Sequence, residues 1–372
     1  MNRLKGPGVE RGPDYLLRSA KQNHDSCPAC LAGMSTHQER YFPSLMLELS
    51  LACQNTDRSR ALLDGRVRIE GCRINFIDGP AEALFQRAFR HEEFDISELS
   101  LGTHILTTAR GQSRYIGIPV FLSRSFRHSA IYVRSDRGID SPEALKGCRI
   151  GVPDFQQTAG IWVRGMLADE YGFDRCDVTW VTGGLEQTGR EARMPVNLPP
   201  ELRIEPVGPD QTLAALLDEG DIDAVIAPRP PSCFGRNAKV QRLFHDFRSA
   251  EEAWVRKTGL FPPMHMVGIR RSLVERHPWL PVNVYQAFRK AHEIAMQEIV
   301  TADTLRVMHP WIVSEVERIK GVMGDDYWRY GMAGNRHDID TLQRYATDDG
   351  LIAGAVPIEQ LFAVSTFDGF SF

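Results

Sequence analysis

The chain has 372 residues, of which 42% are hydrophobic and 25% are charged, and its formal net charge is -4 at pH 7. This length favours two domains, or one domain with a large insertion, in a globular protein. The slightly acidic balance argues against nucleic-acid binding, which normally needs a basic face, but arginines gathered in one pocket could still bind an anionic substrate.

Neither a membrane span nor an export signal is expected from the sequence. No hydrophobic run approaches the ~20 residues that a membrane-spanning helix needs. Residues 1–40 also lack the apolar core of a signal peptide. The 7 cysteines, an odd number, fit reduced thiols better than a disulfide framework. We therefore expect a cytoplasmic protein without a membrane partner, and the sequence leaves open whether it forms a homo-oligomer.

Residues 1–43 predict a flexible N-terminal extension, because they show no hydrophobic periodicity and contain glycine-proline pairs. Cys27 and Cys30 within it have the spacing of a redox motif, but no predicted strand precedes them. Structural zinc sites need four ligands on an ordered frame, so no metal site is expected.

From residue 45 onward, strand and helix patterns alternate, which predicts an α/β sheet. Predicted strands cover residues 45–52, 74–77, 95–100, 115–122 and 130–134. A short helix is predicted at 57–63, and another at 103–109. A further helix opens at Pro80, since the apolar residues after it recur at helical spacing: Ala81, Leu84, Phe85 and Ala88.

A second unit of the same kind begins at residues 141–147. Its predicted strands cover 148–152, 178–181 and 222–227, and its predicted helices cover 158–171, 211–219 and 251–258. Residues 264–269 then predict a strand that returns to the first unit. The remainder is mostly helical, with one apolar stripe formed by Val284, Phe288, Ala291, Ala295 and Ile299.

Six stretches in collinear order carry a resemblance to a known family. They are DISELSL (95–101), SRSFRHSAIYV (123–133), GVPDFQQTA (151–159), WVRG (162–165), GGLE with GR (183–190) and TGLFPPMH (258–265). Together they resemble the 4,5-dihydroxyphthalate decarboxylase family. The resemblance implies an α/β fold of the type II periplasmic-binding-protein kind, with two lobes around a cleft. Lobe I would comprise residues 44–137 plus 260–372, and lobe II residues 138–259.

The densest polar cluster contains Arg124, Ser125, Arg127 and His128, in a turn between two predicted strands. Arginine forks suit a dicarboxylate, so Arg124, Arg127 and Ser125 are candidate substrate-binding residues. His128 is a candidate catalytic acid, because histidine exchanges protons near neutral pH. The alternative is a solvated turn with a structural histidine.

Two further catalytic candidates are Glu98, as a base, and His265, beside the expected hinge. Glu98 and the candidate substrate contact Ser100 end a predicted strand, which is the usual ligand edge of an open α/β sheet. Glu98 could instead bond backbone amides. His104 and Arg229 are weaker candidates for contacts in the cleft.

The remaining candidates for substrate binding come from the second unit. Gln156 and Thr158 begin a predicted helix, whose N-terminus attracts anions, although the same residues could simply cap it. Arg164 lies on that helix and could equally be a surface arginine. Glu186 and Arg190 lie in a glycine-rich loop, where they could close over a ligand or pair with each other.

The resemblance implies decarboxylation of 4,5-dihydroxyphthalate to 3,4-dihydroxybenzoate (protocatechuate) and CO2, in phthalate degradation. No cofactor is expected, because the sequence has no Walker-type or dinucleotide-binding glycine loop and no lysine in the family-like stretches for a Schiff base. Two alternatives stay open: a solute-binding protein of an ABC-type transporter, which uses the same fold, and an enzyme acting on another small aromatic carboxylate.

Overall fold

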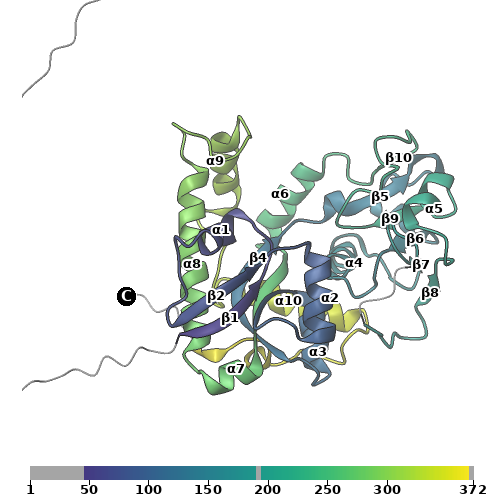
Figure 1. Ribbon diagram of the computed structural model, residues 1–372. Coiled ribbons are helices and arrows are strands. Elements are labelled where there is room, and N and C mark those ends of the chain that lie inside the picture. Colours follow the sequence, from purple (N-terminus) through teal and green to yellow (C-terminus); the bar gives the residue numbers. More distant parts are fainter. Residues whose placement is uncertain (1–45, 190–193, 368–372) are drawn as a thin grey trace, which may run out of the picture. The chain divides into compact units, whose positions relative to one another are not determined.

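Two β-sheets flanked by helices organise the part of the chain that the structure describes, residues 46–189 and 194–367 (Figure 1). The structure is a computed structural model, and the described residues belong to one unit, Leu45–Phe372. The predicted α/β class is confirmed. The predicted extension, residues 1–43, lies outside the described residues.

The first sheet has the strand order β2-β1-β3-β11-β4. Its strands are β1 (Leu47–Ala52), β2 (Cys72–Ile77), β3 (Ile96–Ser100), β4 (Tyr115–Arg124) and β11 (Pro263–Arg270). β1 pairs in parallel with β2 and β3, whereas β11 lies antiparallel between β3 and β4. The strand predicted at residues 264–269 therefore does return to the first sheet.

Helices pack on both faces of the first sheet because its strands carry apolar side chains on both. In β4, Ile118 and Val120 join the same core as Val284 and Phe288 of α8, whereas Phe121 joins the core that α3 buries on the opposite face. The helices are α1 (Asp57–Leu63), α2 (Ala81–His91), α3 (Leu101–Ala109), α7 (Arg271–Arg276) and α8 (Leu280–Ile299) (Figure 1). No described helix combines the length and apolar character that crossing a membrane requires.

The second sheet has the strand order β10-β5-β9-β6-β7-β8. Its strands are β5 (Ile131–Arg134), β6 (Arg149–Val152), β7 (Thr179–Thr182), β8 (Arg203–Pro206), β9 (Ala224–Ile226) and β10 (Val240–Arg242), and its helices are α4 (Thr158–Tyr171), α5 (Leu213–Glu219) and α6 (Phe247–Thr258). β5 belongs to this sheet, although the expected lobe boundary follows it at residue 137. The sequence pattern misses β8 and β10, since these short edge strands bury few side chains.

The chain passes between the two sheets twice. Residues 125–130, which we call the crossover segment, lead from β4 to β5, and residues 259–262 lead from α6 to β11. The two passages are tied together, because the Ser125 N–H donates to the Pro262 carbonyl at 3.1 Å. The C-terminal part then forms α9 (Ile312–Met323), α10 (Arg336–Asp348) and α11 (Ile358–Leu361).

Helix α10 packs closely on α4 of the second sheet. The Tyr345 ring lies against Gly165, where an added Cβ would come within 2.1 Å of the ring, so only glycine allows this approach. Beside this contact, Arg164 donates to Asp349 at 2.6 Å, and both side chains are fully buried. This buried ion pair fixes the end of α10 to α4.

Replacing Arg164 with methionine should lower the free energy of unfolding by about 3–5 kcal/mol, because Asp349 would remain buried without its main partner. Urea denaturation followed by circular dichroism measures this loss. Arg336→Met is the matched control, since it breaks only the exposed Arg336–Asp340 pair on α10 and should cost less than about 0.5 kcal/mol. Equal losses in the two variants would contradict this account of the buried pair.

Candidate functional site

A cavity of about 390 Å³ lies where parallel strands of both sheets end, and we call it the cleft cavity. This volume suits a single small organic ligand. Of the residues proposed from the sequence, six line it: Ser100, Ser125, Arg127, Thr158, His265 and the weaker candidate Arg229. Its other lining residues include Gln54, Glu82, Phe85, Ser123, Gln157, Leu185 and Met264.

The N-termini of α2, α3 and α4 all reach the cleft cavity, through Ala81, Ser100 and Thr158. Across the two sheets, the Thr158 hydroxyl lies 3.0 Å from the Ser100 hydroxyl and accepts the Gly102 N–H at 3.0 Å. A Cβ on Gly102 would lie only 3.0 Å from Thr158 Oγ1, so glycine permits this contact. Helix N-termini carry partial positive charge, and together they favour an anionic ligand here.

Glu98 and His265 form a hydrogen-bonded pair at this cavity. His265 Nδ1 lies 2.7 Å from Glu98 Oε1, and Glu98 Oε2 accepts the Gln54 N–H at 2.9 Å. The Glu98 side chain is 2% exposed and that of His265 is 21% exposed. With Nδ1–H donated to the carboxylate, Nε2 has no hydrogen-bond partner among the described residues. This is the arrangement of a histidine oriented for proton transfer.

The position of His265 follows from the pairing of β11. It lies opposite Ser100 of β3 and Ser123 of β4, and the register with β4 shifts on both sides of it. Such irregularities re-aim a side chain from its regular direction in a sheet. The Phe85 ring packs edge-on against the imidazole, with the ring centroids 4.8 Å apart, and so limits its rotation.

Arg127 and Arg229 are the arginines that line the cleft cavity within the described residues. Arg127 Nε is buried and has no hydrogen-bond partner there. Burial lowers the pKa of Arg127 to about 10, opposed in part by the negative charge of Glu251, so its guanidinium stays charged at neutral pH. A charged guanidinium group with an N–H that has no hydrogen-bond partner is well placed to bind a carboxylate.

Two other predicted substrate arginines do not line this cavity. Arg124 is buried against α10, where it pairs with Asp338 at 3.1 Å and donates to the Phe261 carbonyl at 2.6 Å. Arg164 is bound to Asp349, as described above. Each is held by protein groups inside the core, so both join α10 to the rest of the fold.

Two further predicted contacts from the second unit, Gln156 and Glu186, do not line the cleft cavity. Gln156 is buried and donates to the Met194 carbonyl at 2.9 Å. Glu186 accepts from the Ser232 N–H and hydroxyl, each at 2.7 Å, and so joins two loops. Arg190 lies outside the described residues.

His128 does not line the cleft cavity. It is 1% exposed, and the rings of Phe244 and Trp254 lie edge-on to it at 5.1 and 5.7 Å. Burial lowers the pKa of His128 to about 4. Burial likewise lowers the pKa of His104 to about 4, and His104 Nε2 contacts the Leu361 carbonyl at 2.9 Å. Both histidines are therefore neutral at physiological pH.

These buried histidines should make the protein less stable in acid. In the unfolded chain they bind protons as the pH falls below 6.5, whereas in the fold they stay neutral down to about pH 4. Each should therefore remove about 2 kcal/mol of stability between pH 7 and pH 5. Urea denaturation at both pH values should show a smaller loss for His128→Leu than for the wild type. The control His245→Leu, at an exposed position, should leave the loss unchanged, and an unaltered loss in His128→Leu would contradict the assignment.

Sequence reasoning missed several residues of the cavity, among them Gln54, Phe85 and Ser123. Gln54 follows the end of β1 and Arg229 follows the end of β9, so both lie at the strand edge where ligands bind in open α/β sheets. Their positions just after predicted strands could have identified Gln54 as a candidate for ligand binding. The same reasoning would have made Arg229 a stronger candidate. The sequence pattern identified Phe85 only as a residue on the apolar face of a predicted helix, and gave no sign that it lines a cavity.

The described residues contain no group of three or more histidine, cysteine, aspartate or glutamate side chains placed to hold a metal ion. Cys27 and Cys30 lie outside the described residues.

Known proteins similar to this chain include members of the family that the sequence resembles. No family model matches the chain. A 4,5-dihydroxyphthalate decarboxylase of Comamonas testosteroni is 41% identical over 325 residues, which cover 87% of this chain and 98% of the relative. A 4,5-dihydroxyphthalate decarboxylase of Pseudomonas putida is 47% identical over 211 residues, which cover 56% of this chain and 82% of the relative.

The fold is also similar to a solved structure, the periplasmic sulfonate-binding protein SsuA of Methylobacillus flagellatus KT. The TM-score is 0.52 and the identity 14%, with 86% of this chain and 92% of that chain covered. This likeness shows the fold alone, and it confirms the predicted two-lobed, periplasmic-binding-protein-like architecture. By its identity to the two relatives over most of their lengths, the chain belongs to the 4,5-dihydroxyphthalate decarboxylase family.

Proposed function

We propose that this chain decarboxylates 4,5-dihydroxyphthalate to 3,4-dihydroxybenzoate (protocatechuate) and CO2 without a cofactor, as a carbon-carbon lyase of phthalate degradation. The observation that carries the proposal is the His265–Glu98 pair, because it places an oriented imidazole at a cavity that attracts anions. Both relatives are named for this activity.

The reaction needs a proton at one ring carbon. Each carboxylate of the substrate is para to a hydroxyl, which feeds electron density into the carbon that bears the carboxylate. Protonated His265 gives its Nε2 proton to that carbon, and the hydroxyl oxygen shares the resulting positive charge. The carbon-carbon bond then breaks, its electron pair restores the aromatic ring, and CO2 leaves. Solvent reprotonates His265, so one proton is consumed for each CO2 released.

Glu98 acts on the substrate through His265 in this scheme. The sequence suggested Glu98 as a base, but its Oε1 is bound to His265 and its Oε2 to the Gln54 N–H. We therefore propose that Glu98 orients the imidazole and stabilises its positive charge before the proton is transferred.

The two carboxylates of the substrate need different surroundings. Arg127 and the N-terminus of α4 at Thr158 are proposed to hold the carboxylate that stays. Strong pairing of the departing carboxylate would stabilise the ground state and oppose its loss. Phe85, which contacts His265, supplies an apolar wall on the side where that carboxylate leaves.

A panel of aromatic acids tests the proposed function. The purified protein is incubated with 4,5-dihydroxyphthalate, 4-hydroxyphthalate, 3,4-dihydroxybenzoate and phthalate, and CO2 release is followed. We expect turnover of 4,5-dihydroxyphthalate and none of phthalate, which lacks the para hydroxyl. Saturable binding without CO2 release from any compound would indicate a solute-binding protein instead.

We also propose that the protein works in the cytoplasm. Among the described residues the cysteines are free thiols, Cys53, Cys72 and Cys233 being buried, as suits a reducing compartment. Immunoblots of cytoplasmic and periplasmic fractions test this location, and recovery in the periplasm would contradict it.

A further inference from the structure

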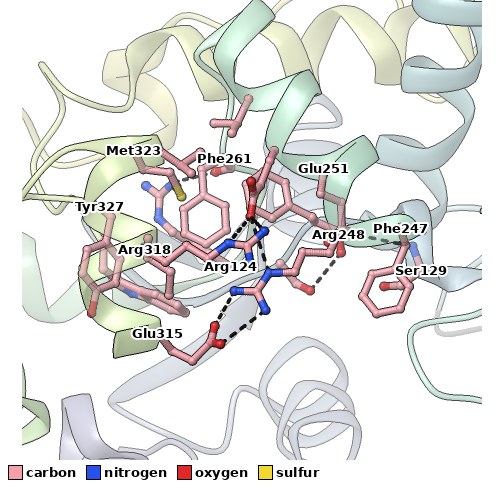
Figure 2. A pocket seen from close by; sticks show the side chains of 17 residues that line it. Arg124, Ser129, Phe247, Arg248, Glu251, Phe261, Glu315, Arg318, Met323 and Tyr327 are labelled. Atoms are coloured by element: carbon pink, nitrogen blue, oxygen red, sulfur yellow. Dashed lines mark hydrogen bonds and ion pairs between the residues drawn. The ribbon is translucent and has the colours of Figure 1, made fainter. Parts of the chain in front are cut away.

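A second cavity, of about 430 Å³, lies between α6, α9 and the crossover segment, and we call it the hinge pocket (Figure 2). Its walls are mainly apolar and aromatic. The rings of Phe126 and Phe261 lie 4.9 Å apart, and those of Phe261 and Trp328 lie 5.6 Å apart. α9 adds Val322 and Met323. Such walls suit a flat aromatic ring, and the volume exceeds the ~150 Å³ that accepts benzene in an engineered cavity.

Four of the charged side chains around the hinge pocket are balanced in pairs. Arg248 of α6 binds Glu315 of α9, as Figure 2 shows, and Arg318 of α9 donates to Glu252 of α6 at 2.9 Å. These groups bridge the two helices and neutralise one another. An ion entering the pocket would find no unbalanced charge among these four groups. Glu251, a further carboxyl group of the lining, would disfavour an anion, so an uncharged ligand fits better than an anionic one.

One polar group of the pocket can select for a hydroxyl. Glu251 accepts the Ser129 N–H at 3.3 Å through Oε1, and it lines the pocket beside Phe247 (Figure 2). Burial raises the pKa of Glu251 to about 7. Its carboxyl group remains a hydrogen-bond acceptor in either protonation state, and a phenolic O–H is a matching donor.

The hinge pocket and the cleft cavity share one wall, the crossover segment. Ser125 lines both, Phe126 and Ser129 line the hinge pocket, and Arg127 lines the cleft cavity. A ligand in the hinge pocket would therefore press on the segment that carries the carboxylate-binding arginine. Restricting such a segment in its binding conformation lowers the cost of binding on its other side.

We propose that the hinge pocket binds an uncharged single-ring phenol, which donates its hydroxyl to Glu251 and lowers KM for the dicarboxylate by holding the crossover segment in place. The first part concerns binding alone and is independent of the proposed decarboxylation. The second part rests on that function and on the role of Arg127.

Calorimetric titration with 4-methylphenol, in the presence of saturating phthalate to occupy the cleft cavity, tests the binding. The wild type should bind it saturably, and toluene, which lacks the hydroxyl, at least about tenfold more weakly. Val322→Trp should weaken binding, because the indole takes up part of the pocket. Glu317→Trp is the matched control, since Glu317 is exposed on the same helix and does not line the pocket.

The experiments test three parts of the proposal separately: the site, the role of the hydroxyl and the effect on KM. Absent binding to the wild type, or equal binding to Val322→Trp, would overturn the site, and equal binding of toluene would overturn the role of the hydroxyl. The comparison of toluene with 4-methylphenol needs no variant, so it stands even if Val322→Trp does not fold. An unchanged KM with 4-methylphenol bound would overturn only the coupling, whereas an inactive wild type that still binds 4-methylphenol would overturn only the proposed decarboxylation.

Discussion

Replacing His265 with asparagine should lower kcat by about a thousandfold while leaving the binding of phthalate nearly unchanged. Asparagine can still donate a hydrogen bond to Glu98, so the local structure should persist. It cannot deliver a proton to the ring carbon, which is the step we assign to Nε2. Steady-state kinetics with 4,5-dihydroxyphthalate and calorimetry with phthalate measure the two quantities separately.

His128→Leu is the matched control for this result. His128 is enclosed by Phe244 and Trp254 and does not reach the cleft cavity. The folded variant should therefore keep most of the wild-type kcat. If His128→Leu loses turnover and His265→Asn retains it, the general acid is His128, and the assignment made here is wrong.

Replacing Arg127 with leucine should raise KM by about 10- to 100-fold, since it removes a charge-assisted contact with the carboxylate that stays. kcat should fall much less than in His265→Asn, because Arg127 holds the substrate and does not transfer a proton. Arg127→Lys should recover only part of the loss, because an ammonium keeps the charge but lacks the planar fork.

Steady-state kinetics on the three proteins separates the effects on KM and kcat. Arg68→Leu serves as the control, since Arg68 is exposed and absent from the cleft cavity, and its KM should equal that of the wild type. An unchanged KM in Arg127→Leu would remove Arg127 from the substrate site and leave Arg229 as the remaining arginine of the described lining.

Much of the fold was predictable because its elements bury regular apolar patterns. The stripe from Val284 to Ala295 formed a helix that packs on the first sheet, and the helix after Pro80 begins where proline favours a helix start. The return strand at 264–269 was recognisable for the same reason. The edge strands β8 and β10 were not, because their pairing partners, and not their own burial, determine that they are strands.

The site was less predictable, because residue type does not tell where a side chain points. Arg124 and Arg127 are three positions apart in one turn, yet Arg124 enters the core to meet Asp338 while Arg127 lines the cleft cavity. The difference depends on α10, more than two hundred residues later in the chain. A sequence pattern alone carries no sign of that contact.

The proposed catalytic pair, Glu98 and His265, shows that the contacts between predicted residues are also hard to foresee. Glu98 and His265 were both selected by chemical type and by their positions near strand ends. Their contact at 2.7 Å depends on the antiparallel pairing of β11 with β3 and on the irregular register around His265. The sequence proposed both residues as candidates, and the sheet topology explains why they lie in contact.

The products that the purified, chelator-treated protein forms from 4,5-dihydroxyphthalate test whether it is a decarboxylase. NMR spectroscopy of the mixture, with trapping of the released gas, gives both the product and the stoichiometry. We expect one CO2 and one 3,4-dihydroxybenzoate for each substrate consumed, because the carboxylate that we propose is held by Arg127 stays on the ring. Saturable binding of 4,5-dihydroxyphthalate with no CO2 released would contradict this expectation.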